Sequence, residues 1–221
     1  SGEFINVISQ SKRQKELIGV DVNGDILEIA KETNKDPKTK WVLVQKGMRI
    51  PISSESIDII TMTEVLEHIY NKNSILLELN RILKHKGLLM VTVPGNHLFS
   101  FLDMGNFKFV FPKIHKFFYI RKYGKEKYNY RYVNNPFGLV GDIEKEAGWH
   151  YQFSRKEFKI LAEENNFELI QYGGIGFFFR ILINIEYFTP NFFKPIFRKL
   201  INLDNFLFSK AQIYFILRKI N

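Results

Sequence analysis

The chain has 221 residues, of which 45% are hydrophobic and 25% charged, a composition typical of one large soluble globular domain. It contains no cysteine, which excludes disulfides and thiolate metal sites. The longest uncharged apolar runs near the C-terminus, 172–179 and 181–185, fall far short of the roughly 20 residues that cross a bilayer. No histidine or carboxylate pair has a convincing metal-ligand spacing.

The first half of the chain alternates helices with short apolar strands. The hydrophobic pattern predicts helices at 3–13, 24–34 and 71–84, and strands at 17–22, 41–45, 56–62 and 87–94. Strands that alternate with helices at this spacing indicate a parallel sheet with helices on both faces, which is an α/β fold.

Residues 96–150 interrupt this alternation, and we interpret them as an insertion or lid within a single domain that spans 1–221. The basic charge is concentrated there, because eight basic residues between Phe107 and Arg131 face one acid, Glu126, so this segment carries +7 of the net +9. Such a basic and aromatic patch indicates a phosphorylated substrate, a lipid head group or a nucleic acid as partner; the alternative is a solvated surface. His115 belongs to this patch and is not expected to be catalytic.

The regular pattern resumes at Ser154. Ser154 and Glu157 form a capping box, which predicts a helix over 154–166, and strands are expected at 167–174 and 211–220. A further helix should begin near residue 194 or 195, because Pro195 is tolerated only in the first turn. We expect its apolar stripe to be core; the alternative is reversible contact with an anionic membrane, since 190–221 holds six basic residues and one acid. The stripe consists of Phe193, Ile196, Phe197, Leu200 and Ile201.

The opening segment SGEF places Gly2 directly before the first helix, and the strand after that helix ends in Asp21, nineteen residues later. In nucleotide-binding α/β folds a glycine-rich turn admits the ligand, and an acid about 20 residues on binds the ribose hydroxyls. We therefore interpret SGEF as the end of such a turn, with the earlier glycines and a strand upstream of residue 1. The alternatives are a cloning remnant for SGEF and a helix-capping or turn role for Asp21.

Two longer stretches carry a family resemblance. RIPISSESIDIITMTEVLEHI at 49–69 and LLELNRILKHKGLLMVTVPG at 76–95 contain a Leu-Pro-Phe-like turn at 50–52, Val-Leu-Glu-His at 65–68 and Arg-Ile-Leu-Lys at 81–84, followed by Gly87. This combination resembles the class I S-adenosylmethionine-dependent methyltransferases, in particular the ubiquinone- and menaquinone-biosynthesis group. The resemblance runs from residue 1 to about 95 and resumes at 154–174.

The resemblance implies a Rossmann-like, doubly wound, mostly parallel sheet with an antiparallel last strand, and S-adenosylmethionine as cofactor. It implies that Gly2 passes under the amino-acid part of the cofactor, Asp21 binds the ribose, Val22 packs on the adenine and Thr63 lines the methionine end. Where the family usually has an acid for the adenine amine, this chain has Lys46, which has no acceptor to offer. Backbone groups around Gly47 and Met48 are the expected substitutes.

Four residues invite a catalytic interpretation. His97 and His150 are candidates for a general base, because they flank the insertion and histidine titrates near neutral pH. Glu67 and His68 are expected instead to organise their loop and to pack locally, and as neighbours they cannot share one helix face.

The resulting prediction is methyl transfer to a small-molecule or lipid-linked acceptor of anionic character, with 96–150 as the lid. One alternative is a non-catalytic methyltransferase-like protein at a membrane surface. Another is an RNA methyltransferase, although TMTEVLEH stands where such enzymes usually carry Asn- or Asp-Pro-Pro-aromatic, so nucleic acid is not expected. No secretory signal precedes the first helix, so we expect a cytoplasmic protein, in contact at most with the inner face of the membrane.

Overall fold

The computed structural model describes residues 3–10, 16–45, 49–96, 111–133, 151–176, 178–208 and 212–220. The chain divides into two compact units, which we describe separately. The first comprises Ser1–Ile52 with Gly138–Asp142, and the second comprises Ser53–Phe137 with Ile143–Asn221.

The described part of the first unit consists of two parallel strands and two helices. Its elements are α1 (Glu3–Gln10), β1 (Leu17–Asp21), α2 (Gly24–Thr33) and β2 (Thr39–Leu43). Leu17 lies opposite Thr39 and Asp21 opposite Leu43, so the carboxyl ends of both strands meet at one edge. Gly19, in the middle of β1, allows the Trp41 ring of β2 to pack closely against the β1 backbone, because a Cβ at this position would lie 2.3 Å from that ring.

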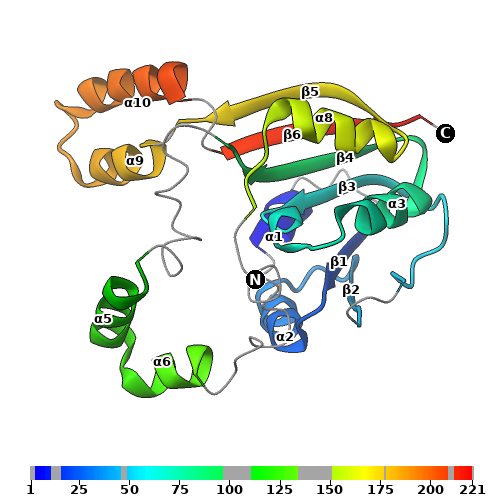
Figure 1. The fold of residues 1–221 in the computed structure, drawn as a ribbon, viewed down its shortest axis with the longest axis horizontal. Coiled ribbons are helices and arrows are strands. Elements are labelled where there is room, and N and C mark those ends of the chain that lie inside the picture. The colour runs from blue at the N-terminus through cyan, green and yellow to red at the C-terminus, as the bar shows by residue number, and fades with distance from the viewer. Residues whose placement is uncertain are drawn as a thin grey trace. The chain divides into compact units, whose positions relative to one another are not determined.

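The second unit contains a four-stranded sheet in the order β3-β4-β6-β5 (Figure 1). The strands are β3 (Ile57–Thr63), β4 (Leu83–Pro94), β5 (Phe167–Ile175) and β6 (Gln212–Lys219). β3 and β4 are parallel, whereas β6 runs antiparallel to both of its neighbours. The predicted α/β sheet with an antiparallel last strand is therefore confirmed.

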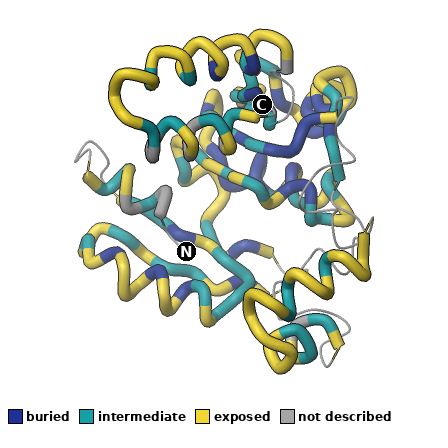
Figure 2. Tube along the Cα trace, turned by 90° about the vertical axis from the view of Figure 1, so that its left-hand side faces the viewer, coloured by how far each residue is buried: buried dark blue, intermediate teal, exposed yellow. Residues whose placement is uncertain are grey.

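Apolar side chains between the sheet and two helices form the core of this unit. The helices are α3 (Lys72–Ile82) and α8 (Arg155–Glu164), and the short 3-10 helix η1 (Leu66–His68) follows β3. Phe158 of α8 stacks on Phe215 of β6 with ring centroids 3.8 Å apart, and both rings are fully buried. Burial of each such ring stabilises the fold by about 1.5–3 kcal/mol. Figure 2 shows the buried residues concentrated around the strands near the C-terminal end of the chain.

Hydrogen bonds of buried asparagine side chains join α3 to the turn that follows α8. The side-chain amide of Asn80 in α3 donates hydrogen bonds of 3.2 Å to the carbonyls of Asn165 and Asn166, at the turn that follows α8. The Asn165 amide in turn donates to the Asn73 side chain at 2.7 Å. These bonds satisfy two turn carbonyls and hold the helices at one spacing.

The boundary between α3 and β4 differs from the sequence prediction. The helix was expected to run to residue 84 and the strand to begin at 87, whereas the helix ends at Ile82 and the strand begins at Leu83. Leu83 pairs with Ile57, and its carbonyl accepts a 2.9 Å hydrogen bond from the buried Lys219 ammonium. A long-range contact therefore ends the helix two residues early.

The insertion also contains structure that periodicity did not predict. Within it, α5 (Pro112–Tyr123) and α6 (Lys125–Tyr132) form a helical hairpin. No single apolar face was visible in the sequence because α5 carries apolar or aromatic residues on two opposite sides. The segment before β6 likewise forms two helices, α9 (Phe179–Phe188) and α10 (Lys194–Phe208).

The prediction that a helix begins near residue 194 is confirmed, since α10 begins at Lys194. The expectation that its stripe is core is wrong for most of its members. Ile201 is buried and Phe197 partly buried, but Phe193, Ile196 and Leu200 are exposed. The reason is that α10 packs mainly against α9 and has few contacts with the sheet, chiefly at β5.

Candidate functional site

The carboxyl end of β1 presents an acid in a defined geometry. Asp21 is half-buried, and its Oδ1 accepts a 2.9 Å hydrogen bond from the backbone N–H of Asn23. Asn23, not Asp21, caps α2, because its side chain accepts from the N–H groups of Asp25 and Ile26. Among the described residues no hydrogen bond reaches Asp21 Oδ2, so this oxygen is available to accept one from a ligand hydroxyl.

Two apolar residues lie next to this acid, one in the chain and one on the neighbouring strand. Val22 follows it and is half-buried, and Leu43, opposite Asp21 in the parallel register, is exposed. An acid next to exposed apolar surface suits a nucleoside, which combines hydroxyls with a flat ring.

The carboxyl ends of β3 and β4 form the second relevant edge. Thr63 ends β3 directly opposite Thr92 and is exposed. Glu64 follows with φ of 53°; its N–H donates to the Thr92 carbonyl at 3.1 Å, and its carboxylate accepts from the Thr92 hydroxyl at 2.9 Å. The double link fixes the turn that leads to η1. Sequence reasoning did not identify Glu64.

Glu67 and His68 lie in η1. Glu67 is fully buried, its carboxylate lies 3.6 Å from His68 Nε2, and its carbonyl accepts a 3.4 Å hydrogen bond from the Tyr151 N–H. This bond connects the loop after β3 to the segment that precedes α8. The contacts are those of a residue that organises its loop.

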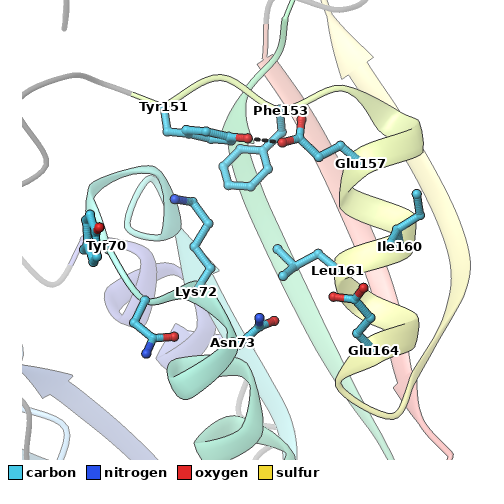
Figure 3. A pocket seen from close by; sticks show the side chains of 10 residues that line it. Tyr70, Lys72, Asn73, Tyr151, Phe153, Glu157, Ile160, Leu161 and Glu164 are labelled. Carbon is cyan, nitrogen blue, oxygen red and sulfur yellow. Dashed lines mark hydrogen bonds between the residues drawn. The ribbon is translucent and has the colours of Figure 1, made fainter.

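A pocket of about 520 Å³ opens beside this edge, within the second unit. Its walls are the start of α3, the segment that contains Tyr151 and Phe153, and the side of α8 that faces α3 (Figure 3). The lining residues are Tyr70, Asn71, Lys72, Asn73, Tyr151, Phe153, Glu157, Ile160, Leu161 and Glu164.

Lys72 is the central cation of the pocket. Its Nζ donates to the Ile69 carbonyl at 3.2 Å and lies 4.1 Å from the ring centroid of Tyr151 and 5.8 Å from that of Phe153. Burial lowers the pKa of Lys72 below the ordinary lysine value, and the charge of Glu157 partly opposes this shift. The ammonium is therefore held in a partly desolvated, aromatic environment.

Glu157 connects the two sides of the pocket. Its carboxylate accepts a hydrogen bond from the Tyr151 hydroxyl and closes the capping box with Ser154 (Figure 3). Tyr151 therefore contacts both charged groups, the Lys72 ammonium over its ring face and the Glu157 carboxylate at its hydroxyl. The result is an aromatic wall with one cation and one anion in fixed places.

The predicted site residues are only partly within the described structure. Asp21 and Val22 lie at the carboxyl end of β1, and Thr63 at that of β3, in separate units. The other predicted site residues lie outside the described residues. They are Gly2, Lys46, Gly47, Met48, His97 and His150.

Sequence reasoning missed Lys72 and Tyr151 and gave Glu157 only a capping role. The signal was weak, because the Lys72–Tyr151 contact joins residues that are 79 positions apart and no local pattern marks it. The one local sign was the position of Tyr151, three residues before the N-cap Ser154, from which its hydroxyl reaches Glu157.

Comparison with known protein families gives the following result. Residues 1–91 match the family model described as a methyltransferase domain. A demethylmenaquinone methyltransferase from Staphylococcus saprophyticus is 29% identical over 133 residues, which cover 59% of this chain and 55% of that protein. The chain thus spans little more than half the length of this relative. The ubiquinone/menaquinone biosynthesis C-methyltransferase UbiE of Campylobacter jejuni is 24% identical over 191 residues, or 80% of this chain and 71% of that protein.

Solved structures agree at the level of the fold. An S-adenosylmethionine-dependent methyltransferase from Mesorhizobium loti superposes with a TM-score of 0.56 at 7% identity, covering 97% of this chain and 85% of that one. A methyltransferase of the same description from Methanosarcina mazei gives a TM-score of 0.52 at 14% identity, covering 97% and 86%. At such identities the likeness concerns the arrangement of helices and strands.

Proposed function

Because this chain belongs to the class I S-adenosylmethionine-dependent methyltransferases, we propose that it transfers a methyl group to a small-molecule or lipid-linked acceptor. The single observation that carries the proposal, beyond the family match, is the half-buried Asp21 at the carboxyl end of β1, with Oδ2 open to a ligand.

The residues of the first unit fit the nucleoside part of the cofactor. We assign Asp21 to the ribose hydroxyls and Val22 to the adenine face, since a charge-assisted hydrogen bond and apolar contact are what these groups require. Gly2, Lys46, Gly47 and Met48 complete this assignment on sequence grounds, and Thr63 is assigned to the methionine end. When bound, S-adenosylmethionine supplies a methyl group that the positive sulfur has already activated.

The pocket around Lys72 is the proposed acceptor site. Tyr151 and Phe153 offer ring faces to a planar acceptor, and the Lys72 ammonium can hold a negatively charged acceptor oxygen. The names of the two quinone-biosynthesis relatives suggest a quinone precursor as one such acceptor.

Transfer to a carbon or a hydroxyl replaces a proton of the acceptor, so a base must remove it. His97 and His150 remain the proposed bases. Their assignment rests on the sequence, in which they flank the insertion 96–150.

The test separates cofactor binding from acceptor chemistry. The protein is incubated with methyl-labelled S-adenosylmethionine and with lipid, small-molecule and RNA fractions of a cell extract, and the label is followed. The proposal expects label in the small-molecule or lipid fraction, and Lys72→Met should raise the acceptor KM while cofactor affinity in calorimetry stays unchanged. Label only in RNA, or no cofactor binding at all, would contradict it.

A further inference from the structure

The hairpin of α5 and α6 is held together by aromatic rings on its inner side. The Tyr132 ring of α6 lies 5.2 Å from both His115 and Tyr119 of α5, and 5.2 Å from Tyr128. His115 and Tyr119 are themselves 5.6 Å apart, one helical turn from each other. These contacts account for the packing of the two helices on each other.

The opposite side of α5 carries a second apolar face, which no other element covers within the described residues. Ile114, Phe117 and Phe118 follow the i, i+3, i+4 spacing and are 47%, 62% and 59% exposed. No residue of α5 is buried. We call these three residues the Phe117 face. Successive residues turn by about 100°, so the centre of this face lies about 130° around the helix from His115 and Tyr119, with Phe118 nearest to them.

Cations border the Phe117 face. Arg121 continues it by one turn, and Lys113 and Lys122 lie on either side of it. Residues 111–133 contain seven Lys and Arg against the single acid Glu126, a net charge of +6. Six of these cations are exposed, and none of the six forms an ion pair within the described part of the chain. They are Lys113, Lys116, Arg121, Lys122, Lys125 and Lys127.

We propose that the α5–α6 hairpin is a docking element for anionic membranes, which lays the Phe117 face into the interface of the bilayer. Because α6 covers the other apolar side of α5, the exposed surface of this helix is one apolar strip with cations on both borders, which is the arrangement that binds in the plane of the interface. The apolar residues enter the boundary between head groups and acyl chains, and each nearby cation gains from the negative surface potential. No helix in the described ranges is long and apolar enough to cross a bilayer.

Charge and geometry favour this occupant over two others. A second copy of the hairpin would bring six exposed cations against six more, which opposes association. A single-stranded nucleic acid uses exposed rings interleaved with cations, and Tyr123, with Lys122 and Lys127 at 5.0 and 5.3 Å from its ring centroid, is one such ring. The Phe117 face favours the membrane, because its three apolar side chains form one strip and Ile114 has no ring on which a base could stack, and nucleic-acid binding is an outcome of the test below.

Vesicle binding tests the proposal without cofactor or acceptor, so its failure is distinct from failure of the methyl-transfer proposal. The protein is co-sedimented with vesicles of phosphatidylcholine alone and of phosphatidylcholine with about 30% phosphatidylglycerol, a composition chosen to resemble a charged leaflet. We expect pelleting with the anionic vesicles only, and weaker pelleting as salt rises. Phe117→Ser with Phe118→Ser should weaken partitioning at least tenfold, and so should Lys113→Gln with Arg121→Gln and Lys122→Gln.

Two matched variants serve as controls. Phe192→Ser with Phe206→Ser removes two exposed rings of the α9–α10 region, and Lys35→Gln with Lys38→Gln and Lys156→Gln removes the same charge elsewhere. Both should bind like the unmodified protein. Phe118→Trp adds a second readout, since its emission should shift to the blue on anionic vesicles only.

Four outcomes would overturn the proposal. They are equal binding to neutral and anionic vesicles, no binding at low salt, loss of binding in the Phe192/Phe206 variant but not in the Phe117/Phe118 variant, and binding to oligouridylate without binding to vesicles. Because the substituted side chains are exposed, circular dichroism should be unchanged in every variant, and this check guards against loss of folding.

Discussion

The ammonium of Lys72 lies 4.1 Å above the ring of Tyr151, whose hydroxyl donates to the Glu157 carboxylate. A cation over the face of the ring and an anion at its hydroxyl end are thus held in one pocket, by α3, α8 and the segment that enters α8. Burial beside the ring lowers the pKa of the Lys72 ammonium, and the negative charge of Glu157 raises it and partly opposes this effect.

This arrangement predicts the response of Lys72 to its neighbour. Glu157→Gln removes the negative charge that raises the pKa of Lys72 and leaves burial, which lowers it, so the pKa should fall further. NMR of ¹³C-labelled lysine side chains would measure it, with Glu163→Gln on the outer side of α8 as the control. An unchanged Lys72 titration in Glu157→Gln would contradict the electrostatic coupling.

The same lysine predicts a pH dependence of stability. Its pKa is lower in the folded than in the unfolded chain, so between the two values the unfolded chain binds more protons and folding stability rises with pH. Lys72→Met should remove this contribution and flatten the dependence in that alkaline window. Urea unfolding at several pH values checks it, with the exposed Lys156→Met expected to keep the slope of the unmodified protein.

Cofactor affinity should depend on Asp21. Asp21→Ala removes the acceptor proposed for the ribose hydroxyls, and we expect affinity to fall more than tenfold, or about 1.4 kcal/mol and above. Calorimetric titration with S-adenosylmethionine measures this. Asp25→Ala, in the first turn of α2, changes the same residue type four positions away and should have little effect. Equal affinities of the two variants would refute the assignment.

Asn80 should be important for stability. Asn80→Ala removes the side-chain donor of the Asn165 carbonyl, whereas the Asn166 carbonyl keeps its 3.1 Å bond from the Ile220 N–H; the expected loss of unfolding free energy is about 1–3 kcal/mol. Denaturant unfolding measures the difference. Asn202→Ala, an exposed asparagine of α10, is the matched control and should stay within about 0.5 kcal/mol. A loss for Asn80→Ala no larger than for the control would show that the link is not stabilising.

Gly87 should not tolerate a side chain. A Cβ there would lie 2.9 Å from the Lys84 carbonyl oxygen and 3.1 Å from that of Asp58, and both contacts are with backbone, which cannot turn away. Gly87→Ala should therefore destabilise the protein by about 1–3 kcal/mol. At Gly24, the start of α2, the nearest atom would be 3.9 Å away, so Gly24→Ala should be neutral or stabilising. Thermal melts of the two variants would compare them directly.

Local patterns in the sequence were sufficient to predict most of the helices and strands in the sheet-forming half of the chain. The helix that begins at Lys194 and the capping box of Ser154 and Glu157 were predictable, because proline geometry and capping hydrogen bonds act within a few residues. The family motifs around Val65–His68 and Gly87 were sufficient to identify the fold. The position of Asp21 at a strand end was likewise set by a short apolar strand followed by a turn.

Other features were decided only by tertiary contacts. The early end of α3 follows from the pairing of Leu83 with Ile57, and the exposure of Ile196 and Leu200 follows from the limited contact of α10 with the sheet. The α5–α6 hairpin depends on rings that meet only when two helices fold back on each other. The Lys72–Tyr151–Glu157 arrangement depends on α3 and α8 lying against the same sheet. The periodicity of a sequence shows which face of a segment is apolar. Only the folded sheet determines which distant side chains come within about 4–6 Å of one another, and these contacts form the pocket and alter the pKa of Lys72.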